Sequence, residues 1–241
     1  MKKIVITGGT SRFSIALRKI KTKHKLFFPT KKEFDITKVH TIKSYLTKTK
    51  PNIVIHLAGL SRPMKIHDEN IVKSIDLNIV GTANVTKCCY ENNTKLIYFS
   101  TNYVYPGIKG NYSEKNPLLP VNNYAWSKLG GEASVQLYKN SLILRICMTE
   151  KPFVHKKAFN DVEMNFMFHE DLAQNLLKLI DQKGIINVGG KKQKVIKFAR
   201  KYNRKISPIS ARKTIDKNYP LNQSMNIDKY KNIIKKNKKI W

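Results

Sequence analysis

The chain has 241 residues, and 41% of them are hydrophobic, which is enough to bury a full core of one domain or of a domain with a small lobe. Its 46 Lys and Arg against 16 Asp and Glu give a net charge of +30. Such a charge suits nucleic acid, an anionic surface or an acidic small molecule. The lysines are spread along the whole chain among Asn and Ile rather than gathered in a patch, so nucleic acid is disfavoured as a partner.

The cysteines Cys88, Cys89 and Cys147 have neither a metal-ligand spacing nor that of a disulfide framework, which favours a reducing compartment. Gly8 follows the amino terminus after too short an apolar run for a signal peptide. No apolar run approaches the roughly 20 residues of a membrane span. We expect a soluble, cytoplasmic protein without a metal site or a membrane partner.

The amino-terminal segment predicts the opening of a dinucleotide-binding unit. A β-rich run over 3–7 ends in a turn over 8–14, and helical periodicity follows through Ile20. Small residues let the backbone approach a pyrophosphate at a helix N-terminus. Ser11 and Ser14 stand where glycine is usual, and their hydroxyls could bond phosphate. Taken alone, the turn is equally consistent with a structural connection.

The next run, 26–28, predicts the second strand. An enzyme that prefers NAD normally has a carboxylate after this strand, whereas Lys31 and Lys32 follow here and Arg12 lies in the preceding turn. Positive charge at this place favours the 2′-phosphate of NADP, although a solvated lysine pair is the plain alternative. A helix is expected to start near Asp35, with Thr37 as its N-cap.

Two later strands are expected to lead to the same edge of the sheet. The run 52–59 is a buried strand in which His56 is interpreted as a packed histidine rather than a catalytic one. Residues 71–90 have helical periodicity, and the strand 95–99 delivers Ser100 and Thr101 to its carboxyl end. In open α/β sheets ligands bind at that edge.

Tyr124 and Lys128 are four residues apart on a predicted helix over 124–138, so their side chains lie on one face. A free tyrosine has a pKa of roughly 10. A neighbouring ammonium is expected to lower the pKa of Tyr124 toward a useful range. With Thr101 bonded to the same substrate oxygen, these groups suit proton delivery to a carbonyl that receives hydride from a nicotinamide. A Tyr-x-x-x-Lys pair alone is weak, and its context carries the hypothesis.

The remaining chain predicts a strand over 141–146, an irregular segment over 147–167 and a helix over 170–180. A strand over 185–188, a helix over 194–202 and a final helix over 224–234 complete it. Alternating strands and helices predict an α/β fold of the Rossmann type, a doubly wound parallel sheet with a small C-terminal substrate lobe. We assign 1–146 to an NADP-binding domain and 147–241 to a reduced substrate lobe, interleaved with the last strand and helices of that domain.

The ordered motifs resemble the extended short-chain dehydrogenases/reductases, and among them the dTDP-4-dehydrorhamnose reductases and related nucleotide-sugar reductases. The resemblance runs from about 3 to 146 and is carried by the stretches 34–37, 54–59, 78–82, 100–105 and 123–132. It resumes weakly at 169–173, 185–190 and 220–229. The segment 145–171 is shorter than is typical, and the aromatic substrate loop is expected to be missing.

The resemblance implies an NADPH-dependent reduction of a nucleotide-linked 4-keto-6-deoxy sugar, with NADH as a second choice of cofactor. It places Thr101, Tyr124 and Lys128 at the catalytic positions, with Lys128 also holding the nicotinamide ribose. The remaining cofactor-binding positions are Gly8, Thr10, Ser11, Arg12, Phe13, Ser14, Lys31, Asp35, Ile36, Leu57, Ala58 and Gly59. The substrate positions are Ser61, Asn102 and Tyr103.

Two other functions stay open. One is a non-catalytic NADP-binding regulatory subunit, as in the regulatory subunit of methionine adenosyltransferase, which is a relative of these reductases. The other is a nucleotide-sugar epimerase with tightly held NAD. Asn102 and Tyr103 replace the acidic pair of related dehydratases, so dehydration is disfavoured. Tyr103 also replaces the cysteine of reductases that epimerise their substrate, so a combined 3,5-epimerase/4-reductase activity is disfavoured as well. A homodimer is one option for the assembly.

Overall fold

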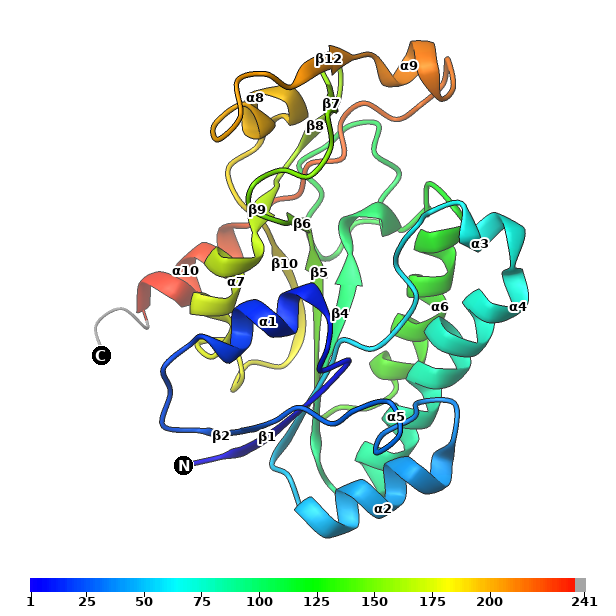
Figure 1. Cartoon of the computed structure of the whole chain (residues 1–241), viewed down its shortest axis with the longest axis vertical. Helices are drawn as coiled ribbons and strands as arrows, with labels where there is room; N and C mark the ends of the chain where they lie inside the picture. The colour runs from blue at the N-terminus through cyan, green and yellow to red at the C-terminus, as the bar shows by residue number, and fades with distance from the viewer. Residues whose placement is uncertain (237–241) are drawn as a thin grey trace.

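Six parallel strands form the central sheet of the computed structural model, which describes residues 1–236 (Figure 1). The strand order is β10-β5-β4-β3-β1-β2, and every neighbouring pair is parallel. The prediction of a Rossmann-type α/β sheet is therefore confirmed. The strands are β1 (Lys3–Thr7), β2 (Lys25–Phe27), β3 (Ile53–His56), β4 (Lys95–Thr101), β5 (Ser141–Ile146) and β10 (Gly184–Val188).

Helices cover both faces of this sheet (Figure 1). Successive strand residues point to opposite faces, so Ile4 and Ile6 join the apolar cluster on one side while Val5 joins the other. One face carries α1 (Arg12–Arg18), α7 (His169–Leu176) and α10 (Asp228–Lys236). The other carries α2 (Val39–Thr49), α5 (Gly81–Glu91) and α6 (Asn123–Gln136).

The sheet topology places the site. From β1 the chain moves to β2 on one side and to β3 on the other, which makes the β1/β3 boundary a switch point. Ligands in such sheets bind beyond the carboxyl ends of the strands at this point. The turn after β1, the loop after β3 and the end of β4 all lie there.

A small lobe sits above this edge of the sheet (Figure 1). The segment 147–167, predicted to be irregular, contains strands of only two or three residues, which are too short to produce a readable periodicity. They belong to three two-stranded sheets. The lobe and its junction contain β6 (Met148–Thr149), β7 (Lys157–Phe159), β8 (Glu163–Met164), β9 (Met167–Phe168), β11 (Gln193–Lys194), β12 (Ser207–Ile209), α8 (Val195–Ala199) and α9 (Ala211–Thr214).

The lobe has its own apolar core, and the chain before residue 146 contributes to it. Val104, Tyr105 and Tyr112 are buried there together with Phe198 and Met225. Conversely, β10, α7 and α10 return to the sheet. Within the part of the chain that the structure describes, no helix is long and apolar enough to cross a membrane.

The predicted helix over 71–90 is in fact three segments, α4 (Ile71–Ser74), the π-helix η1 (Ile75–Val80) and α5, preceded by α3 (Ile66–Glu69). The predicted N-cap at Thr37 is wrong, because α2 begins two residues later with Lys38 at its N-cap. The Thr37 hydroxyl instead donates to the Asp35 carboxylate at 2.8 Å, and the Thr37 N–H donates to the same oxygen at 3.0 Å.

Candidate active site

A cleft of about 1390 Å³ lies between the carboxyl edge of the sheet and the lobe. This exceeds the usual volume of a pocket for one small molecule, so the cleft has room for two ligands. Its sheet-side wall includes Ser11, Arg12, Phe13, Leu57, Gly59, Ser61, Thr101, Tyr124 and Lys128. Its lobe-side wall includes Glu150, Phe153, Phe159, Phe166, Thr214 and Tyr219.

The three predicted catalytic residues meet in this cleft. Thr101 is the last residue of β4, and its hydroxyl accepts a hydrogen bond from the Tyr103 N–H at 3.3 Å. Tyr124 lies in the first turn of α6, where the Asn122 side chain caps the helix. Lys128 follows one turn later on the same face. Strand and helix thus direct a hydroxyl, a phenol and an amine into one space.

The expected lowering of the Tyr124 pKa is not what the structure gives. Burial raises the pKa of Tyr124 to about 12, and its hydrogen bond with Thr101 and the charge of Arg62 offset that only in part. The phenol therefore holds its proton at neutral pH, which suits a proton donor to an oxygen that gains negative charge.

The pKa of Lys128 is shifted further than that of Tyr124. Burial lowers its pKa to about 7, against a smaller opposing effect of Glu132. The Nζ atom lies 4.1 Å from the centroid of the Tyr98 ring, and the Tyr98 hydroxyl donates to the Lys128 carbonyl at 3.1 Å. The aromatic face supports the ammonium in a place that otherwise disfavours it.

Asn78, to which the sequence analysis gave no role, fixes this arrangement from η1. Its Nδ2 donates to the Leu60 carbonyl and to the Ser127 hydroxyl, each at 2.8 Å, and its Oδ1 accepts from the Leu60 N–H at 2.7 Å. Ser127 in turn donates to the Tyr124 carbonyl at 2.7 Å. The stretch 78–82, which carries part of the resemblance, was the available sequence signal, whereas the π-helix that orients Asn78 has no readable pattern.

A buried ion pair supports the same wall. Arg145 on β5 and Glu132 on α6 pair at 2.5 Å, and their side chains are 2% and 0% exposed. Glu132 also accepts from the Ser100 hydroxyl at 2.6 Å, and Arg145 donates to the Tyr105 hydroxyl at 2.8 Å. The pair joins β4, β5 and α6 to the core of the lobe.

The turn after β1 closes on itself. Gly8 has φ +67°, which favours glycine. The Ser14 hydroxyl donates to the Gly8 carbonyl at 2.9 Å, and the Ser11 hydroxyl donates to Ser14 while it accepts from the Ser14 N–H. The side chain of Ser14 is fully buried. The Ser14 hydroxyl thus bonds within the turn, and its contact with a phosphate stays a prediction.

The end of β3 is organised by Thr7. Its hydroxyl accepts from the N–H groups of Leu57 and Ala58, both at 3.1 Å, and is bonded to His56 Nδ1 at 2.8 Å. Burial lowers the pKa of His56 to about 3, so it stays neutral. Its other ring nitrogen is bonded to Thr82 at 3.2 Å, which confirms a packed histidine.

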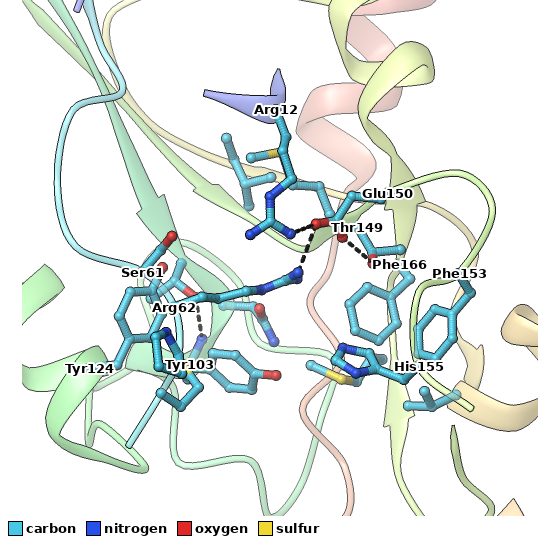
Figure 2. A pocket seen from close by; sticks show the side chains of 18 of the residues that line it. Arg12, Ser61, Arg62, Tyr103, Tyr124, Thr149, Glu150, Phe153, His155 and Phe166 are labelled. Atoms are coloured by element: carbon cyan, nitrogen blue, oxygen red, sulfur yellow. Dashed lines mark hydrogen bonds and ion pairs between the residues drawn. The ribbon is translucent and has the colours of Figure 1, made fainter. Parts of the chain in front are cut away.

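The positive charges in the turn after β1 and directly after β2 are arranged differently from the prediction. Arg12 points across the cleft to Glu150 (Figure 2). Lys31 lies exposed in the turn after β2. Arg18, which the sequence analysis missed, stacks 3.9 Å from the centroid of the Phe28 ring, directly after β2. Its spacing of four residues, about one turn, from Ser14 along α1 was the available signal.

The other predicted binding residues fall into two groups. Ser61, Asn102 and Tyr103 line the cleft, and the Tyr103 ring centroid lies 6.4 Å from that of Tyr124. Within residues 1–236, seven predicted cofactor residues lie outside the lining: Gly8, Thr10, Ser14, Lys31, Asp35, Ile36 and Ala58.

Aromatic side chains do reach the cleft from the lobe, although the aromatic substrate loop was expected to be missing. Phe153 and Phe166 contact one another at 6.3 Å between ring centroids, and Phe159 contacts Tyr219 at 5.9 Å. All four line the cleft, and Figure 2 shows Phe153 and Phe166 opposite Tyr124. Phe159 ends β7 and Phe166 directly precedes β9, whereas Phe153 and Tyr219 lie outside the helices and strands. The sequence pattern could not indicate that these residues converge.

The strand order and the cleft at the carboxyl edge of the sheet are those of a Rossmann-type α/β fold. The structure is similar to that of the dTDP-4-dehydrorhamnose reductase from Bacillus anthracis in complex with NADP. That comparison has a TM-score of 0.84 at 21% identity and covers 95% of this chain and 92% of the other. The structure from Clostridium acetobutylicum with the same name gives 0.82 at 21% identity, over 92% and 89%.

Residues 1–149 match the RmlD substrate binding domain, and the chain belongs to this family. A dTDP-4-dehydrorhamnose reductase from Aggregatibacter actinomycetemcomitans is 27% identical over 154 residues, which are 62% of this chain and 52% of that protein. Methionine adenosyltransferase 2 subunit beta from Xenopus laevis is 32% identical over 106 residues, 44% and 31% of the two chains. The matches thus span about a third to a half of these two relatives.

Proposed function

We propose that the protein is an NADPH-dependent reductase of a nucleotide-linked 4-keto-6-deoxy sugar. The observation that carries this proposal is the convergence of Thr101, Tyr124 and Lys128 on one cleft that also borders the turn after β1. The volume of the cleft fits a dinucleotide. So do the positive φ angle of Gly8 in the turn after β1 and the position of Leu57 directly after β3. Bound NADPH would supply the hydride.

The residues of the chain would manage the proton. Tyr124 is protonated at neutral pH, so it donates to the oxygen of the substrate as negative charge develops there. Thr101 orients the carbonyl through a hydrogen bond, and the positive charges of Arg62 and Lys128 stabilise the phenolate left behind. Lys128 would also hold the nicotinamide ribose. Arg18 and Lys31 supply positive charge near the adenosine end, which favours NADPH over NADH.

Replacing Tyr124 by phenylalanine tests this proposal. We expect Tyr124→Phe to reduce turnover of a 4-keto-6-deoxy nucleotide sugar by at least ~100-fold, because general acid catalysis is worth about that much or more. NADPH binding should stay within a few-fold, as measured by fluorescence titration. Tyr90→Phe on α5, where the tyrosine is 67% exposed, is the matched control and should keep full turnover. Unchanged turnover in Tyr124→Phe would remove Tyr124 from the mechanism.

A binding module is the second candidate. The similarity to methionine adenosyltransferase 2 subunit beta favours it, as does a turn whose serine hydroxyls are bonded internally. Such a module would bind NADPH but oxidise none of it with any of a panel of keto sugar nucleotides. A sugar epimerase, the third option, would retain its dinucleotide through purification without consuming it.

A further inference from the structure

Three charged side chains from distant parts of the sequence meet in the cleft. Arg12 opens α1, Arg62 follows β3, and Glu150 follows β6 in the lobe. Both arginines donate to the same carboxylate oxygen of Glu150, Arg62 at 2.7 Å, and Thr149 donates to the other oxygen at 3.2 Å. Figure 2 shows Arg62 extending from the side of Tyr124 across the cleft to Glu150.

The charges in this cluster do not balance. Two guanidinium groups share one carboxylate, so one positive charge remains. The side chains of Arg12 and Arg62 are 56% and 37% exposed, whereas that of Glu150 is 13% exposed. Ion pairs with exposed partners are weak, and an arriving anion with more charge can compete for the arginines. Guanidinium groups match phosphate oxygens in geometry, and a diphosphate offers several of them.

We propose that Arg12 and Arg62 form a clamp for the diphosphate group of a ligand, and that Glu150 occupies this clamp in the free protein. The choice of diphosphate rests on the proposed function, because both a nucleotide sugar and a dinucleotide carry one. When the diphosphate binds, Glu150 leaves the arginines, since a third negative charge would be repelled. The carboxylate is thus an internal competitor of the ligand.

Neutralising the competitor is the sharpest test. We expect Glu150→Gln to tighten the binding of inorganic pyrophosphate roughly three- to tenfold in calorimetric titrations, because an amide competes weakly for guanidinium groups. Arg12→Gln and Arg62→Gln should each weaken it several-fold. The control is Glu163→Gln in the same lobe, which removes a carboxylate paired with Lys192 at 2.9 Å outside the cleft lining and should leave affinity unchanged.

Titrations with NADP⁺ and dTDP then identify the source of the diphosphate. Tightening for NADP⁺ alone assigns the clamp to the cofactor, and tightening for dTDP alone assigns it to the substrate. Unchanged or weaker binding of all three probes in Glu150→Gln would overturn the proposal. The ion pairs of Glu150 with Arg12 and Arg62 would then only join the lobe to the sheet. The two arginine variants test the clamp even if Glu150→Gln fails to fold. No turnover is required, so the result is independent of whether the keto sugar is reduced.

Discussion

The two walls of the cleft are built by different means. The sheet-side wall consists of a strand of seven residues, a helix of fourteen, and buried polar contacts between them. The lobe-side wall consists of two- and three-residue strands drawn from three parts of the chain, packed around aromatic rings. The first wall is specified by local periodicity and by hydrogen bonds, and the second mainly by apolar packing between distant segments.

This difference has a consequence for the roles of the walls. Chemistry requires groups placed to within fractions of an ångström, and long elements with satisfied buried contacts provide that precision. Recognition of a large substrate tolerates more adjustment, which a wall of short strands and aromatic side chains allows. Changes in the sheet-side wall should therefore have larger effects on stability and turnover than matched changes in the lobe.

The largest expected effect is the loss of the buried ion pair. Glu132→Gln leaves the Arg145 guanidinium uncompensated in the core, which should lower the free energy of unfolding by about 3–5 kcal/mol. The lobe counterpart Glu163→Gln breaks the partly exposed pair with Lys192 and should cost less than about 1 kcal/mol. Urea denaturation of the two variants makes the comparison, and equal losses would contradict it.

Two adjacent glycines in α6 give an intermediate effect. A Cβ atom on Gly131 would lie 2.4 Å from the Asn78 carbonyl oxygen, whereas one on Gly130 would lie 2.8 Å from the flexible end of Ile79. Gly131→Ala should therefore cost about 2 kcal/mol and also reduce turnover, because it pushes α6 from η1. Gly130→Ala should cost well under half as much. Thermal melts and activity assays of both variants measure the difference. Equal losses in the two variants would contradict the prediction and mean that α6 shifts to accommodate either methyl group.

The third effect, that of Lys128, is the one that depends on pH. Its pKa falls from 10.5 to about 7 on folding, so between these values the unfolded chain binds a proton that the folded protein releases. Stability of the wild type should then rise from pH 7 to about 10.5 through this group. Lys128→Met removes the charge, so it should be more stable by about 1–3 kcal/mol at pH 7 and lose that advantage toward pH 10.5.

Urea unfolding of Lys128→Met and wild type across that pH range measures the difference. A stability difference that stays constant with pH would mean that folding does not lower the pKa of Lys128. Because Lys128→Met should also lose turnover, the sheet-side wall would give up stability for its chemistry.

The sequence predicted the sheet-side wall well for identifiable reasons. The runs of β1, β4 and β5 are bounded by turn residues, and Tyr124 and Lys128 are placed by helical geometry alone. The Asn78 contacts were not predictable, because they depend on a π-helix that shifts the register. Neither was the direction of the Tyr124 pKa, since burial outweighs local charge. The Arg12–Glu150 pairing joins residues 138 positions apart, which no local pattern encodes.

The turn after β1 shows how a chain can absorb an unusual residue. The oxygen that Ser14 brings to a position normally held by glycine satisfies a carbonyl of its own loop. Replacing Ser14 by glycine would remove this buried hydrogen bond and leave the Gly8 carbonyl without it. In this turn glycine would therefore be less stabilising than serine. Serine and its loop have become interdependent.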